Sequence, residues 1–306
     1  MTMAIDLAKA LNCPQPEPPC GTGASCNRIA QGLHADIRVL ELANTESNNS
    51  SQTRIGIGQI RSIQKECALK PYEGKTRVII INNASLLTEE ASNALLKTLE
   101  EPPNNVTFII LAPDKVDVLP TILSRCNVIS LRPVSTSFLA EHLLKNYEAT
   151  ETQSLEIARI SGGRPGWAIN AATRPNIMPE RKAYITKIHL LPYLDIGDRF
   201  SFAQEMASLF SKNRTSVFEQ LVMWEDFWRD VLITSIDARD YLINISVLED
   251  VESASRDFTL TEIIGILKKV KSTIELLRSN ANPRLTLDSL ILYLPHPRSN
   301  SKYSTK

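Results

Sequence analysis

Residues 88–103 read TEEASNALLKTLEEPP. Leucine or alanine recurs at positions 87, 91, 95 and 99, a spacing that places these side chains on one face of a helix. Thr88 is suited to cap that helix, the two glutamates after it suit the positive N-terminal end, and Pro102 and Pro103 stop it. The stretch therefore predicts an amphipathic helix that packs against an apolar layer.

Strand-like segments lie on both sides of this helix. Four short apolar runs occur at 37–42, 78–81, 107–111 and 128–131. They are rich in β-branched residues and do not alternate with polar ones, which is typical of strands buried on both faces. A second helical pattern, Ile60, Ile63 and Cys67, falls between the first two runs. Strands that alternate with helices predict a parallel α/β sheet within residues 1–132.

The rest of the chain shows only helical patterns. Residues 133–175 hold three short helices, the third of which follows a sharp SGGRPG turn at 161–166. Residues 176–298 hold longer helices, one of which carries a wide aromatic face around Trp224 that we expect to be core. Residues 299–306 are polar, so we expect a frayed tail.

Composition excludes several classes of protein. The 306 residues carry equal numbers of basic and acidic side chains, 34 each, so a strongly basic nucleic-acid binder is excluded. The apolar runs are too short to cross a bilayer, and residues 1–11 carry Asp6 and Lys9, unlike a signal peptide. Five cysteines do not make a disulfide scaffold, so we expect a cytoplasmic protein with reduced thiols and no membrane contact.

Four segments resemble motifs of the AAA+ clamp-loader subunits of bacterial DNA polymerase III. Residues 88–103 resemble the NALLKTLEEPP motif of that family, 119–126 (LPTILSRC) its SRC motif, and 57–61 (IGQIR) a segment of the same ATPase core. Residues 280–285 (NANPRL) resemble a collar signature of the delta-prime subunits. The segments also occur in the order that the family shows.

The resemblance implies an AAA+ P-loop-type ATPase core over 1–132, a helical lid over 133–175 and an all-α collar for oligomerisation over 176–298. The first strand of that core and the P-loop after it are not found. In this fold the first strand lies inside the sheet, so its absence leaves a gap of about 10 Å with unpaired backbone groups on both sides. We therefore expect the natural chain to begin upstream of Met1.

The resemblance also indicates that this chain does not hydrolyse ATP itself. No G-x-x-x-x-G-K-[ST] string is present to cradle phosphates. The run at 78–81 is followed by Asn82 and Asn83, where carboxylates would help to hold Mg²⁺. Alignment with the family puts Ala112 at a polar sensor position and Gly166 at the position of an ATP-contacting arginine. These departures match the delta-prime subunits, which resemble ATPases that no longer use ATP.

Two other interpretations stay open. The first is a gamma/tau-type clamp-loader ATPase that is truncated at its N-terminus. A missing start would hide a P-loop, but it does not account for the neutral residues at the other positions of the ATP site. The second, a bare DNA-binding module, is weakened by the zero net charge and by the lack of a groove-reading motif.

The resemblance gives Arg125 the central chemical role. In the family, the SRC arginine reaches across a subunit boundary to the γ-phosphate of ATP on the neighbour. A guanidinium suits that contact because it is always charged and donates through a planar fork. Ser124 completes the predicted catalytic pair. The alternatives are a surface salt bridge for Arg125 and a packing role for Ser124 and Cys126.

The resemblance also indicates a zinc site. In the family this region holds four cysteines, the last three spaced C-x₂-C-x₂-C, that bind a structural zinc. Here Cys13, Cys20 and Cys26 remain, and Gly23 stands where the middle cysteine belongs. Zinc prefers four tetrahedral ligands, so one position is open. His34 is a possible fourth ligand, although it fits a GxHxD turn of the family, and a loop that kept three thiols without metal is the alternative.

The expected function follows from the resemblance. The chain is expected to act as a non-hydrolysing, stator-like subunit of the clamp loader, within the DNA-directed DNA polymerase holoenzyme. The expected partners are the gamma/tau and delta subunits and, through the complex, the β sliding clamp and primed DNA. No cofactor of its own is expected apart from the candidate zinc, since ATP is held by the neighbouring subunit.

Overall fold

A computed structural model describes residues 1–42 and 54–298. The chain divides into two compact units, Met1–Leu131 and Arg132–Lys306. The tail predicted at 299–306 lies outside the described residues. None of the helices in the described ranges is long and apolar enough to span a bilayer.

A small parallel sheet forms the centre of the first unit. Its strands are β1 (Ile37–Leu40), β2 (Arg77–Ile81) and β3 (Val106–Ile110), in the order β1-β2-β3. In register, Ile37 pairs with Val78, and Val78 pairs with Thr107. The middle strand is covered on both faces, since residues 78–81 are all fully buried. The prediction of a parallel α/β sheet is confirmed.

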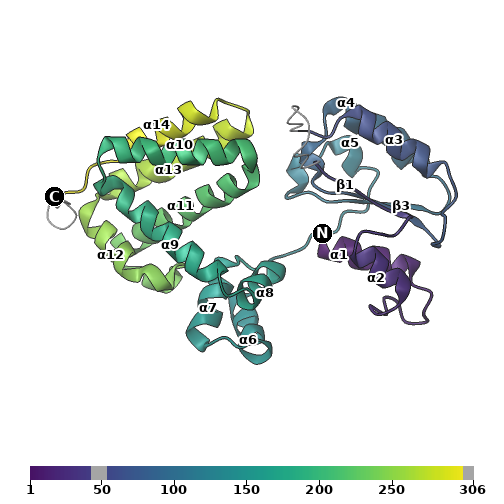
Figure 1. The fold of residues 1–306 in the computed structure, drawn as a ribbon, viewed down its shortest axis with the longest axis horizontal. Coiled ribbons are helices and arrows are strands. Elements are labelled where there is room, and N and C mark those ends of the chain that lie inside the picture. Colours follow the sequence, from purple (N-terminus) through teal and green to yellow (C-terminus); the bar gives the residue numbers. More distant parts are fainter. Residues whose placement is uncertain (43–53, 299–306) are drawn as a thin grey trace. The chain divides into compact units, whose positions relative to one another are not determined.

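Helices cover both faces of this sheet (Figure 1). On one face lie α1 (Thr2–Asn12) and α2 (Ala24–Ala30), which pack against Val78 and Ile80. On the other face lie α3 (Ile57–Cys67), α4 (Glu89–Glu100) and α5 (Pro120–Leu123), which pack against Ile79 and Ile81. Because side chains alternate along a strand, β2 supplies two separate cores.

The quoted stretch forms α4 as predicted. The Oγ1 of Thr88 accepts a hydrogen bond from the N–H of Ala91 at 3.2 Å, and Ala91 and Leu95 are fully buried. On the neighbouring helix α3, the Nε2 of Gln64 donates to the carbonyl of Ala94 and to the Oγ1 of Thr98, both at 2.8 Å. These bonds hold α3 against α4, the two helices that contain residues 57–61 and most of residues 88–103.

The prediction of a fourth strand at 128–131 is wrong. The segment carries no strand, and no backbone hydrogen bond joins it to the sheet within the described residues. Val128, Ile129 and Leu131 are exposed, Ile129 by 75%. A β-branched run becomes a strand only where a neighbouring strand supplies hydrogen bonds to its backbone, and this run has no such neighbour.

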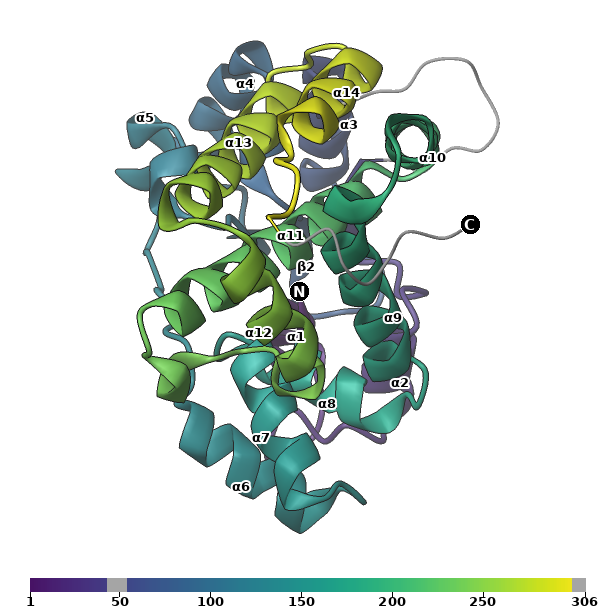
Figure 2. The ribbon, with the colours of Figure 1, turned by 90° about the vertical axis from the view of Figure 1, so that its left-hand side faces the viewer.

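Three short helices open the second unit and cluster together in Figure 2. They are α6 (Thr136–Asn146), α7 (Glu151–Ile160) and α8 (Pro165–Thr173), which share a core around Leu143 and Ile157. The turn between α7 and α8 needs glycine, because Gly163 has a φ of 78° and a Cβ there would lie 2.5 Å from the Cβ of Pro133. This explains the SGGRPG string.

Longer helices make up the rest of the second unit. They are α9 (Ile177–Leu190), α10 (Ile196–Lys212), α11 (Arg214–Ser235), α12 (Leu248–Asp257), α13 (Leu260–Arg278) and α14 (Pro283–Tyr293). Helix α11 packs against α10, α12 and α13, and its Trp224, Phe227 and Trp228 are fully buried. The prediction of an aromatic core is confirmed.

The short and long helices are joined by hydrogen bonds. The guanidinium of Arg159 on α7 donates to the carbonyl of Leu242 at 2.8 Å, and the N–H of Ser246 donates to Glu156 at 2.9 Å. Both partners lie in the segment before α12. Short 3-10 turns complete the described elements, at Ala84–Leu86, Lys115–Asp117, Leu191–Tyr193, Arg239–Tyr241 and Ile245–Val247.

Candidate interface arginine and cysteine cluster

Arg125 is exposed on the first unit and lies directly after the short helix α5. Pro120 is the first residue of that helix. The buried Ile122 packs into the core that β2 shares with α3 and α4. Cys126 packs against the same core, as expected, whereas Ser124 is exposed, so a packing role for Ser124 is wrong. The backbone around Arg125 is therefore anchored while its side chain remains 31% exposed.

The guanidinium of Arg125 is bound within its own chain. Its Nε donates to the Oε1 of Glu100 at 2.7 Å, and its Nη2 donates to the same oxygen. Its Nη1 donates to the carbonyl of Thr121 at 2.9 Å and to the Oγ of Ser124 at 3.2 Å. Arg125 thus forms the surface ion pair that the sequence left as an alternative, and its partner is Glu100.

Cys126 is not suited to nucleophilic chemistry. Burial raises the pKa of its thiol above the ordinary value, so less thiolate is present at neutral pH. Because Cys126 also packs against the core of the first unit, it has a structural role.

Neutral side chains directly follow β2, at the place where an acidic Mg²⁺ site would stand. After β2, Asn83 has a φ of 71° and accepts a hydrogen bond from the N–H of Ser85, while the Nδ2 of Asn82 donates to Glu41 at 3.3 Å. The guanidinium of Arg164, near the predicted sensor position, donates back to the carbonyl of Ser161 at 2.7 Å. These side chains serve turns and caps.

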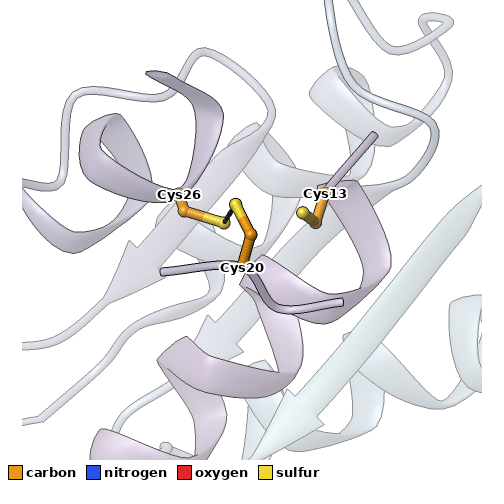
Figure 3. Close-up of side chains that lie close together, drawn as sticks. All are labelled: Cys13, Cys20 and Cys26. Carbon is orange, nitrogen blue, oxygen red and sulfur yellow. Dashed lines mark hydrogen bonds between the residues drawn. The ribbon is translucent and has the colours of Figure 1, made fainter. Parts of the chain in front are cut away.

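Cys13, Cys20 and Cys26 come together at one end of the α1–α2 layer, as Figure 3 shows. Their Sγ atoms all lie within 4.8 Å of one another, and those of Cys20 and Cys26 are 3.8 Å apart. Two thiolates on one tetrahedral zinc are also about 3.8 Å apart, because each Zn–S bond is about 2.3 Å. The three predicted ligands therefore fit a zinc ion.

A fourth protein ligand is not part of this cluster among the described residues. The backbone N–H of Gly23 donates to the Sγ of Cys20 at 3.3 Å, and a Cβ on Gly23 would lie 3.1 Å from that sulfur. His34 belongs to the turn: its Nδ1 accepts from the N–H of Asp36 at 3.2 Å, and its Nε2 lies 3.6 Å from Glu73. His34 is therefore not a ligand in this structure.

The thiols of the cluster differ in acidity. Hydrogen bonds from the backbone of Gly23 and then Thr22 lower the pKa of Cys20 to about 7, so it is partly thiolate at neutral pH. Burial raises the pKa of Cys26. A cation at the cluster would favour the thiolate form of all three.

A buried carboxylate, whose role sequence reasoning missed, supports this end of the unit. Asp36 accepts hydrogen bonds from the N–H groups of Tyr72, Glu73 and Gly74, at 2.7, 2.8 and 2.8 Å. The loop so held returns to the cluster, because Lys75 donates to the carbonyl of Cys13 at 3.3 Å. The GxHxD turn marked the position of Asp36, but its partners lie about 36 residues further along the chain.

Known proteins match this chain along most of its length. The family described as "DNA polymerase III, delta subunit" matches residues 1–135. A protein of Haemophilus influenzae named DNA polymerase III subunit delta′ is 30% identical over 274 residues, 88% of this chain and 78% of that protein. A protein of the same name from Bacillus subtilis is 25% identical over 294 residues, 95% of this chain and 85% of that protein.

Other subunits match less of the chain. The tau subunit of Escherichia coli matches over 51% of this chain. Among solved structures, a DNA polymerase III gamma subunit-related protein from Thermotoga maritima aligns with 87% of this chain and 86% of its own, at 16% identity and a TM-score of 0.42. The sequence matches define the class as subunits of DNA polymerase III. Within that class, the chain belongs to the family of the delta′ subunits.

Proposed function

We propose that this chain is a non-hydrolysing, stator-like subunit of the DNA polymerase III clamp loader and that Arg125 acts in trans on ATP bound by a neighbouring gamma/tau subunit. One observation carries the proposal. A partly exposed arginine stands on an anchored turn of a core whose middle strand, β2, is followed by the neutral residues Asn82 and Asn83. The core thus offers a group for another subunit's ATP site, while amides stand where its own site would need carboxylates.

The chemistry of the guanidinium suits this role. Negative charge spreads over the γ-phosphoryl group as it is transferred, and a planar, permanently charged fork stabilises that charge. An arginine supplied from a neighbouring subunit contributes on the order of 10³-fold or more in rate. Ser124, which accepts a hydrogen bond from the guanidinium, has a positioning role in this proposal.

The helical unit supports assembly with other subunits. On α14 two large apolar side chains are exposed, Leu285, the last residue of the NANPRL segment, by 68% and Leu292 by 60%. Exposed apolar side chains on one helix are common at subunit contacts. We therefore propose that residues 176–298 form the collar contact with gamma/tau and delta, and that the complex carries the contacts with the β sliding clamp and primed DNA.

The ATPase rate of a reconstituted loader tests the proposal. With cognate gamma/tau, delta, β clamp and primed DNA, Arg125→Ala is expected to lower turnover by about 10³-fold while the complex still assembles. Arg125→Lys should recover only part of the rate, since it keeps the charge but loses the fork.

Arg174→Ala serves as the control, because Arg174 is exposed and forms no ion pair among the described residues. Unchanged turnover of the Arg125→Ala loader, with intact assembly, would contradict the role of Arg125. Measurable hydrolysis by the isolated chain would instead favour a gamma/tau-type ATPase.

A structural zinc held by Cys13, Cys20 and Cys26 is a second proposal. It is supported by the 3.8 Å sulfur–sulfur distance and by the lowered pKa of Cys20. Zinc bound there would tie the end of α1 to the start of α2, with solvent at the fourth position. Metal analysis of the purified chain should find about one zinc per chain, and Cys20→Ser should lose it. A chain that holds no zinc at micromolar concentrations of the ion would contradict this.

A further inference from the structure

The guanidinium of Arg125 is nearly saturated by partners in its own chain. An arginine side chain has five N–H donors. Here Nε and Nη2 donate to the Oε1 of Glu100, and Nη1 donates to the carbonyl of Thr121 and to Ser124. Four donors are used. A fork aimed at a phosphate needs two parallel donors on one edge, so this arrangement holds Arg125 back from an anion on another subunit.

The contact with Glu100 is also one that an anion can replace. The side chains of Arg125 and Glu100 are 31% and 50% exposed, so water screens the pair and it is weak. A γ-phosphoryl group carries more charge than a carboxylate, and it would meet the guanidinium at a subunit boundary from which water is largely excluded. The phosphate is therefore the stronger partner once the boundary closes.

We infer that Glu100 holds Arg125 in an inactive position on its own subunit, and that the γ-phosphate on the neighbour must displace Glu100 before Arg125 acts. This inference rests on the proposed function. Glu100 touches neither nucleotide nor reacting atoms, so it is a positioning residue. It lies at the C-terminal end of α4, and Arg125 follows α5, so the pair joins two rigid segments of the same core.

The ion pair between Glu100 and Arg125 predicts a difference in ATPase rate between two states of the loader. In an open complex, Glu100 competes with the phosphate and lowers the fraction of time for which Arg125 is available. In a closed complex, the phosphate has already displaced Glu100, so its removal has little effect. Loss of the carboxylate should therefore raise the resting ATPase rate more than the stimulated rate.

Glu100→Gln is the test, because the amide keeps the size of the side chain and removes its charge. In the reconstituted loader without clamp and DNA, the ATPase rate is expected to rise about two- to fivefold, the worth of an exposed ion pair. With clamp and primed DNA, the rate should change less than twofold. The double variant Glu100→Gln, Arg125→Ala should show the low rate of Arg125→Ala alone.

Glu101→Gln is the matched control. Glu101 is the next residue, is exposed and takes part in no side-chain hydrogen bond or ion pair among the described residues, so both rates should stay at the wild-type level. Thermal unfolding of each variant shows whether a rate change reflects a weaker fold.

The outcomes separate this inference from the function on which it rests. Suppose that Arg125→Ala lowers the stimulated rate but Glu100→Gln leaves the resting rate unchanged or lowers it. Glu100 then does not hold Arg125 in an inactive position, and the trans role of Arg125 stands. If Arg125→Ala leaves turnover unchanged, the proposed function itself is wrong. If Glu100→Gln lowers both rates and the unfolding temperature together, Glu100 only supports the fold.

Discussion

At the scale of single residues, Gly23 decides how many ligands the cysteine cluster offers. Its N–H donates to the Sγ of Cys20, and a side chain placed there would begin 3.1 Å from that sulfur. The φ of Gly23 is −68°, an ordinary value for any residue. A thiol at this position therefore points at the cluster without backbone strain.

Gly23→Cys is expected to tighten zinc binding at least tenfold, because it supplies the open tetrahedral position with a thiolate. Competition with a chromophoric chelator measures the affinity. Gly23→Ala is the control, since it adds the same Cβ without a thiol. Equal affinities for Gly23→Cys and the wild type would show that a thiol at position 23 does not become a zinc ligand.

Residue identity revealed part of the candidate site. Arg125 and the three cysteines were predicted from motifs, and the structure brings the cysteines together. Glu100 was missed as the partner of Arg125, because the two residues are 25 positions apart and only the packing of α4 against α5 brings them within reach. A motif identifies a residue but not what it touches.

At the scale of elements, backbone hydrogen bonds explain both a success and a failure of the sequence pattern. Residues 78–81 form the middle strand because a strand lies on each side. Residues 128–131 have a similar composition but are exposed and unpaired within the described residues. Strand propensity alone did not distinguish them, since it depends on neighbours that are distant in sequence.

Asp36 makes the free energy of unfolding depend on pH. Burial by itself raises the pKa of its carboxyl, but hydrogen bonds from Glu73, Tyr72, Gly74 and Arg77 outweigh burial, so the pKa is lower than usual. A lowered pKa means that the charged form is favoured in the folded state. Its contribution is complete above the unfolded pKa near 4 and is lost as the pH falls through the lower, folded value.

Asp36→Asn is therefore expected to cost about 2–3 kcal/mol at pH 7, because the loop N–H groups lose a charged acceptor. The difference from wild type should shrink below about pH 4. Urea unfolding followed by circular dichroism measures both. Asp117→Asn, at an exposed position without a side-chain hydrogen bond among the described residues, should change little. A difference that stays constant down to pH 2 would contradict the charge-based explanation.

At the scale of the whole molecule, the chain has two compact units, and its tryptophans all lie in one of them. All three, Trp167, Trp224 and Trp228, belong to the unit Arg132–Lys306. Trp224 and Trp228 are fully buried there, so their emission reports the unfolding of that unit. The unit Met1–Leu131 contributes to circular dichroism but not to tryptophan emission.

Leu95→Ala should destabilise the first unit by about 2–5 kcal/mol, because it leaves a cavity under α4. The midpoint by tryptophan emission should stay unchanged, while circular dichroism shows an earlier phase. Ile266→Ala, in the buried face of α13, should instead lower the emission midpoint. If Leu95→Ala shifts the emission midpoint as far as the dichroism midpoint, the two units unfold together.

Local sequence was enough to predict the helix that follows Thr88, the three parallel strands and the aromatic core, because hydrophobic period and capping residues are local properties of the chain. It also identified Arg125 and the three cysteines through their motifs. Tertiary packing was needed to show that 128–131 is not a strand, that His34 is not part of the cysteine cluster and that Glu100 binds Arg125. Each of these depends on which distant atoms come within hydrogen-bonding distance, and local sequence does not specify that.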